Sequence, residues 1–247
     1  MIAVAALLVA LGVLAGVGRA VFLEDLVTRL DPVRTRILQA AGIQDPHAES
    51  RAAIGRQVDS RYVQNPRVGR FHVIGGSVYL LFGLLQFSSR IRRRTIRYHR
   101  WAGRALVVTG LAMAIAGVYF GIRFPYAGLA EIIPVTTFGA LFVIALASGF
   151  VAIRRGEVVR HRLWMTRAFA IGVGISVVRL VAGAADLVLT PLGWMAGEIF
   201  VLSLWAGWGL SVVAAELWLR RLPYQAIGDP GDIAVGTASP SHKLMSN

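Results

Sequence analysis

Two histidine–arginine pairs carry the most suggestive chemistry in the sequence. His99-Arg100 and His161-Arg162 each follow an arginine-rich stretch and lead into a long apolar run. Two imidazoles on neighbouring helices at one membrane depth can ligate a haem iron axially. Arginines close to such a pair can hold the propionates through charge-assisted hydrogen bonds. The pattern makes haem b a candidate cofactor, with His99 and His161 as ligands of its iron. The arginines that would hold its propionates are Arg100, Arg104, Arg162 and Arg167.

The same pairs also have a plainer interpretation. Histidine and arginine at the start of a membrane helix can extend toward lipid phosphates and simply mark the polar interface. In that case Arg104 or Arg167 would find a carboxylate partner within the bundle, and Glu216 is the expected one. The sequence leaves a redox protein and a non-catalytic membrane subunit open, and whether the chain is an enzyme stays undecided.

A second polar cluster lies toward the other ends of the apolar runs. Arg179 stands deep in one run, and Asp186 follows seven residues later on the same helical face. Charges at membrane depth are costly, so they pair with one another or line a wet site. This cluster is therefore either a closed ion-pair network or an outward-facing site for a small solute or lipid, as in a transporter or receptor. Its members are His72, Arg123, Glu131, Arg179, Asp186 and Glu198.

The elements that position these residues are membrane helices. Of the 247 residues, 56% are hydrophobic and only 16% are charged, and the mean hydropathy is +0.62. Soluble domains carry roughly a quarter charged residues, whereas about 20 consecutive apolar residues span a bilayer. The sequence predicts an all-α integral membrane bundle of about six helices, at residues 1–22, 71–88, 101–122, 132–153, 163–189 and 193–219.

The chain divides into four parts by composition. Residues 1–22 are predicted to form a first transmembrane helix that is not cleaved, because no basic segment precedes the apolar run, although Val17-Gly18-Arg19-Ala20 leaves a cleaved signal open. Residues 23–70 are predicted to form a polar, extracytoplasmic segment. That segment is expected to hold two short helices. Asp31-Pro32 should start the first, which should end at Gly42, and Asp45-Pro46 should start the second. Residues 71–221 form a five-helix core with two similar hairpins, each delivering one His-Arg pair. The tail, 222–247, is predicted to be disordered.

Arginine placement predicts the orientation. The stretch from Arg90 to Arg100 contains no acidic residue, and a second arginine-rich loop precedes His161. The positive-inside rule puts both loops and both termini in the cytoplasm. Because the basic residues behind the net charge of +13 cluster between apolar runs, the predicted partners are the bilayer and anionic lipid headgroups, not nucleic acid. The sequence has no cysteine, which excludes disulfides and thiolate ligands.

A set of short motifs in the two hairpins resembles a known family. The motifs are Phe71-His72, Gly75-Gly76, Gln86-Phe87, Arg94, His99-Arg100-Trp101, Gly103-Arg104, His161-Arg162, Trp164-Met165 and Arg167. Together they resemble the DUF2306 family of bacterial membrane proteins, a domain of unknown function. The resemblance implies a multi-pass plasma-membrane protein and no activity. The signature positions that it implies are His72, His99-Arg100, Gly103-Arg104, His161-Arg162 and Trp164-Met165. The layout also resembles, more loosely, haem-bearing four-helix cores of the cytochrome b561 kind, which place ligand pairs at both membrane faces, whereas only the inner pair is present here.

Overall fold

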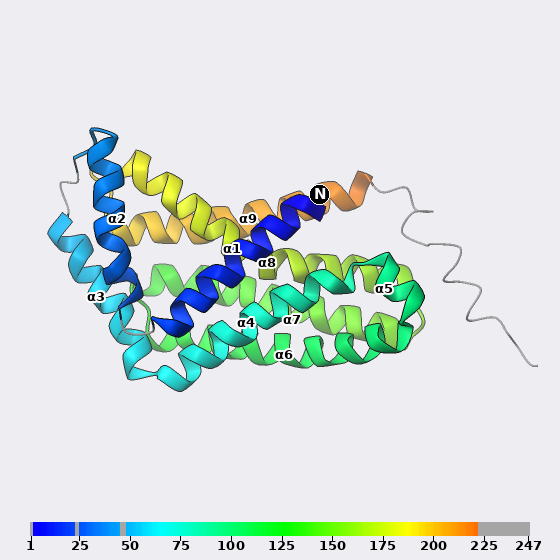
Figure 1. Ribbon diagram of the computed structural model, residues 1–247. Helices are drawn as coiled ribbons and strands as arrows, with labels where there is room; N and C mark the ends of the chain where they lie inside the picture. The colour runs from blue at the N-terminus through cyan, green and yellow to red at the C-terminus, as the bar shows by residue number, and fades with distance from the viewer. Residues whose placement is uncertain (1, 23–24, 45–47, 222–247) are drawn as a thin grey trace, which may run out of the picture.

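The chain folds into helices only, over the residues that this computed structural model describes, 2–22, 25–44 and 48–221 (Figure 1). The predicted disorder of 222–247 and the start signal at Asp45-Pro46 lie outside these residues. The helices are α1 (Ile2–Val21), α2 (Leu26–Ala40), α3 (Ala48–Gln64), α4 (Pro66–Gln86), α5 (Ser89–Arg94), α6 (Ile96–Arg123), α7 (Leu129–Arg154), α8 (Val158–Leu189) and α9 (Ala196–Arg221).

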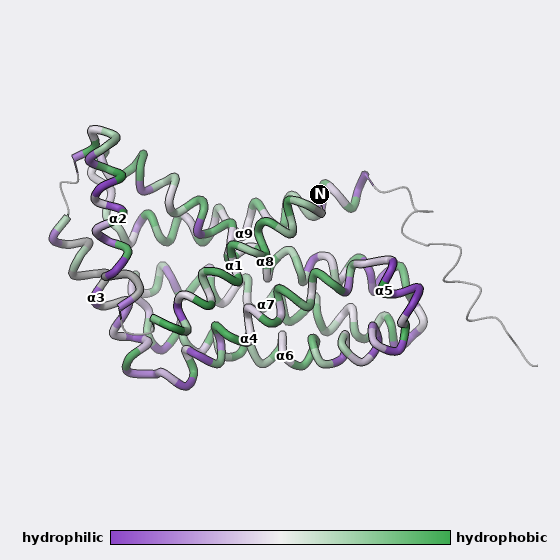
Figure 2. Tube along the Cα trace, in the orientation of Figure 1, coloured by the Kyte–Doolittle hydropathy of each residue, from purple (hydrophilic) through white to green (hydrophobic). Residues whose placement is uncertain are grey.

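Six of these helices are long and apolar enough to cross a membrane: α1, α4, α6, α7, α8 and α9. Their outward faces carry many large apolar side chains, whose exposure to water would be unfavourable. On α6, Trp101, Val108 and Ile115 recur every seven residues on one face and are about two-thirds exposed, at 70%, 68% and 69%. Figure 2 shows apolar colour along the helices and polar colour gathered at the two ends of the bundle. The prediction of an all-α membrane bundle is confirmed.

Four helices form a closed ring. The helices α4, α6, α7 and α8 each pack against the next, and α4 also packs against α8. The α1 helix lies against α4 and α8, and α9 lies against α8 and α7. Tyr79 and Phe142 meet edge-on across the centre of the ring, with their ring centroids 5.4 Å apart. In this arrangement α6 and α8, which carry the two His-Arg pairs, stand at opposite corners.

Several helices begin earlier than the sequence predicts. Both α6 and α8 begin five residues before the predicted apolar runs, so the arginine-rich turns that precede them are helical. The short α5 helix was not predicted, and the hydroxyl of Ser88 caps it by accepting a hydrogen bond from the backbone N–H of Ile91 at 3.4 Å. The α4 helix begins at Pro66, directly after Asn65, rather than at Phe71. Polar residues extend these helices because their side chains leave the bilayer while the backbone stays hydrogen-bonded.

The predicted start of the first short helix at Asp31 is wrong. The α2 helix begins at Leu26 and contains Pro32 in its interior. An ion pair one turn earlier, from Arg29 Nε to Asp25 Oδ2 at 2.6 Å, supports the turn that precedes the proline. The predicted end is confirmed, because α2 stops at Ala40 and Gly42 takes a positive φ of 69°.

The α8 and α9 helices approach each other closely at Gly207. A Cβ at this position would lie 2.5 Å from both the backbone N and the Cα of Val178, so the contact is between backbones and cannot yield by a side-chain rotation. Small residues at such crossings let membrane helices pack by van der Waals contact. The packing of α9 onto the ring therefore depends on this glycine.

Replacing Gly207 by alanine is expected to destabilise the protein by about 1–3 kcal/mol, the usual range for overpacking a tight contact. The measurement is the midpoint of thermal unfolding in neutral detergent. Gly209 on the same helix is a matched control, since a Cβ there meets no atom within 4 Å. Gly209→Ala should leave the midpoint unchanged or slightly higher. Equal midpoints for the two variants would contradict the close approach.

Candidate functional site

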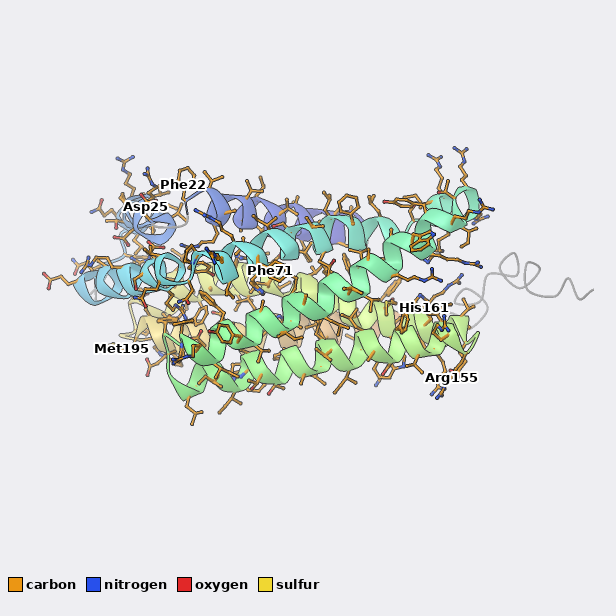
Figure 3. All side chains as sticks on the ribbon, turned by 90° about the horizontal axis from the view of Figure 1, so that it is seen from below. Phe22, Asp25, Phe71, Arg155, His161 and Met195 are labelled. Atoms are coloured by element: carbon orange, nitrogen blue, oxygen red, sulfur yellow. The ribbon has the colours of Figure 1, made fainter. Side chains whose placement is uncertain are left out.

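The two histidines predicted as a pair lie at the same end of the bundle. His99 and His161 are each the fourth residue of their helix, α6 and α8. Figure 3 places His161 and Arg155 at the end opposite Phe22 and Met195. His161 is among the side chains that interact electrostatically with His99. The ring thus brings together two imidazoles from opposite corners.

His161 is oriented by a backbone carbonyl. Its Nδ1 lies 2.8 Å from the carbonyl oxygen of Gly149 on α7. Because that oxygen can only accept, Nδ1 must donate, and in the neutral ring Nε2 then carries the lone pair. A metal-bound histidine is commonly oriented in this way, with its second nitrogen donating to a carbonyl. His161 is therefore prepared to act as a ligand through Nε2.

His99 lies beside a glutamine that was not predicted as a site residue. The Nδ1 atom of His99 and both side-chain amide atoms of Gln86 are buried and have no hydrogen-bond partner among the described residues. Gln86 ends α4, and its Oε1 lies 3.7 Å from where a Cβ of Gly103 would be, one turn after His99. In the sequence, Gln86 was marked only as a polar residue at the end of an apolar run and as part of the Gln86-Phe87 motif, and neither assigned it to a site.

The arginines around His99 are only partly the predicted set. Arg100 and Arg162 are near enough to act on it electrostatically, and so is Arg92, which was not predicted. Arg92 comes from α5, where its Nη1 donates to the carbonyl oxygens of Phe87 at 3.0 Å and Gln86 at 3.3 Å. Since α5 itself was not predicted, its arginine could not be assigned to the site.

The remaining two predicted arginines have other roles. Arg167 forms a bidentate pair with Glu216 of α9, at 2.5 Å and 3.1 Å, as the plainer interpretation anticipated. It also stacks on Trp164, with its guanidinium carbon 4.9 Å from the ring centroid, and Arg104 stacks on Trp101 at 5.3 Å. The two hairpins therefore repeat the same cation–π contact. Arg167 is tied to α9 and is not available to a ligand between the histidines.

The site does not resemble a conventional protein metal centre. Within the described residues, no group of three or more histidine and acidic side chains could hold a metal ion. Two imidazoles alone suffice only where the metal brings its own further ligands, as haem iron does. The composition of the site, with two imidazoles, one amide and three guanidinium groups, therefore suits a planar or anionic ligand better than a bare cation.

At the opposite end of the bundle, arginines of α2 and α3 pair with the acidic side chains. Arg34 of α2 meets Asp186 at 2.6 Å, and Asp186 also accepts from the hydroxyl of Thr190 at 3.0 Å. Arg61 of α3 lies 3.3 Å from Glu131. Glu131 is buried and accepts from two backbone N–H groups, at residues 126 and 127, at 2.6 Å and 3.0 Å.

The predicted network that joins Arg179 to these acids is consequently not formed. Glu198 caps the start of α9 by accepting from the backbone N–H of Met195 at 2.8 Å. His72 joins α4 to α6 through a 3.1 Å hydrogen bond between Nδ1 and the carbonyl oxygen of Met113. Arg123 is exposed at the end of α6. Arg179 has no carboxylate partner in the described part of the chain, because arginines from α2 and α3 pair with two of the acids instead.

The fold and these two polar ends define a class: a multi-pass helical membrane protein with a closed four-helix ring. The model of a family described as "Predicted membrane protein (DUF2306)" matches residues 69–219. This match covers more than half of the chain and nearly all of α4 to α9, and the protein belongs to this family. No curated protein and no solved structure matches the chain.

The buried pair of Arg61 and Glu131 should contribute strongly to stability. Glu131→Ala removes the acceptor of one guanidinium and two backbone N–H groups, so a loss of about 3 kcal/mol is expected. Glu157→Ala is the matched control, because its pair with Arg160 is exposed and should contribute under about 0.5 kcal/mol. The measurement is again thermal unfolding in detergent. A comparable loss in both variants would show that the α3 contact does not hold the bundle.

Proposed function

We propose that the protein binds haem b between His99 and His161 and acts as a membrane-embedded redox protein. The observation that carries this proposal is the hydrogen bond from His161 Nδ1 to the Gly149 carbonyl, at the end where His99 approaches from the opposite corner of the ring. This hydrogen bond fixes the neutral tautomer in which Nε2 of His161 carries the lone pair, the form that binds a metal. Simple anion binding would instead need that nitrogen to donate.

The surrounding residues fit the rest of such a ligand. Arg92, Arg100 and Arg162 supply positive charge close to His99, which would suit two propionate carboxylates. Gln86 Oε1 is buried without a partner and could accept from His99 Nδ1, as the carbonyl of Gly149 does for His161. Bound haem would supply one-electron chemistry. The chain itself would hold the ring, fix both imidazole orientations and exclude water.

We further infer that the arginine-rich end faces the cytoplasm. Both arginine loops and the C-terminal end of α9, with Arg220 and Arg221, lie at the same end of the bundle (Figure 1). The positive-inside rule assigns that end to the cytoplasm, and the cap of α2 and α3 then lies outside. The loops would contact anionic lipid headgroups, and the histidine site would exchange electrons on the cytoplasmic side.

An absorbance spectrum tests the proposal. Protein purified from haem-replete cells should show a Soret band that shifts on addition of dithionite, and His99→Ala or His161→Ala should abolish it. Gln86→Leu should keep a Soret band but retain haem 10- to 100-fold less tightly, the usual effect of losing a hydrogen bond to a metal ligand, while Gln86→Glu should restore retention.

His72→Asn is the matched control, because His72 lies at the other end and bonds to a carbonyl that asparagine can also reach. Its spectrum should equal that of the wild type. All variants are checked for folding by size-exclusion chromatography in detergent. A well-folded, colourless wild-type protein, or a Soret band that survives both histidine substitutions, would refute the proposal.

A further inference from the structure

Arg179 is an exposed cation in the interior of a membrane-spanning helix. It is the twenty-second of the 32 residues of α8, and its side chain is exposed. Within the described residues its side chain makes a long hydrogen bond, 3.4 Å from Nη1 to the carbonyl oxygen of Ile175 in its own helix. A guanidinium at such a depth normally pairs or faces water, since its desolvation is costly.

Side chains from three other helices approach Arg179, and none of them is acidic. Arg19 of α1 and Tyr62 of α3 interact with it electrostatically, and it acts in turn on His72 of α4. Arg19 itself is buried against Asp59, at 2.7 Å. Because the bundle acids Glu131, Asp186 and Glu198 have the partners described above, the positive charge of Arg179 is not neutralised by a described residue.

The helix faces next to Arg179 leave room. Gly76, Tyr79 and Gly83 follow one another along one face of α4, where Tyr79 lies against Gly172 of α8 and Gly83 against Phe169. Gly76 continues that face toward Arg179, and a Cβ there would meet no atom within 4 Å. The same is true of Gly183, one turn after Arg179 on α8. No described side chain closes over either glycine.

A buried hydroxyl at this level also has no partner. The Oγ atom of Ser176 lies one turn before Arg179 on α8, in a side chain with 0% exposure, and it has no hydrogen-bond partner among the described residues. A buried hydroxyl normally finds a partner within the protein or in ordered water. This hydroxyl faces Gly12 of α1, where a Cβ would lie 2.6 Å from the Oγ atom, so it is enclosed between α1 and α8 and is not part of the surface around Arg179.

We propose that Arg179, with His72 beside it, forms a binding site for an anionic amphiphile. The head of such a molecule, a carboxylate or a phosphate, pairs with the guanidinium, and its apolar tail lies along the exposed Leu180 and Leu187, which share one stripe of α8 next to Arg179. The charge of Arg179 selects the head, while the surrounding apolar surface selects a molecule with a tail. This site is separate from the histidine pair and lies toward the opposite end of the bundle.

Ligand-dependent thermal stability of the full chain in neutral detergent tests this site. The probes are dihexanoyl-phosphatidylglycerol, octanoate, inorganic phosphate and, as a zwitterionic control, dihexanoyl-phosphatidylcholine. We expect phosphatidylglycerol or octanoate to raise the wild-type unfolding midpoint in a saturable way. A response to the former alone identifies a lipid headgroup, and a response to the latter alone identifies a free carboxylate.

Arg179→Gln should weaken the apparent affinity for the active probe about tenfold or more, as expected when a hydrogen-bonded charge is removed. Arg179→Lys keeps the charge and should retain part of the response. Arg123→Gln removes an exposed arginine at the same end and should respond like the wild type. The proposal fails if neither anionic amphiphile raises the midpoint, if phosphate or phosphatidylcholine acts equally well, or if Arg179→Gln lowers only the starting midpoint and leaves the response intact.

Discussion

The cost of leaving a charge unpaired in the hydrocarbon governs how this chain is arranged. Three ion pairs tie its extramembrane helices and its first helix into the bundle: Arg19–Asp59, Arg34–Asp186 and Arg61–Glu131. Two of the three link α2 or α3 directly to a membrane helix of the ring. Because breaking a buried pair leaves one charge uncompensated, these pairs hold α2 and α3 as a cap across one end. The other end carries the arginine loops and is free of such a cap.

The ring separates two polar regions, one at each end of the bundle. Each hairpin delivers an arginine-rich turn, a histidine at the fourth helical position and an arginine stacked on tryptophan. Since the hairpins occupy the two sides of a closed ring, their histidines come from opposite corners and are near enough to interact electrostatically. At the capped end, the described residues give His72 no second histidine partner, and Arg179 is exposed there, with neighbours on α1, α3 and α4 that are basic or neutral.

The features that could be predicted from the sequence are those that depend on local composition. Long apolar runs specify membrane helices because only a bilayer accommodates them, so the six spans could be predicted, as could the placement of His99 and His161 at matching helix positions. Helix starts were placed too late, because arginine-rich turns are helical and yet polar. Partners across the fold were not accessible: nothing near Asp186 in the sequence identifies Arg34, and Gln86 and Arg92 became site residues only through the packing of α4, α5 and α6. For Arg167 the sequence offered two roles, a ligand contact or a pair with Glu216, and the packing of α9 against α8 selects the pair.

The central claim is that the two ends of the bundle lie on opposite sides of the membrane, with the histidine site inside. The absence of cysteine from the sequence makes single-cysteine labelling direct. Gln44→Cys lies between α2 and α3 at the capped end, and Thr95→Cys lies between α5 and α6 at the arginine-rich end. With a membrane-impermeant maleimide on intact cells, Gln44→Cys should react at once and Thr95→Cys only after permeabilisation. Labelling of Thr95→Cys in intact cells, or of both positions alike, would contradict the account.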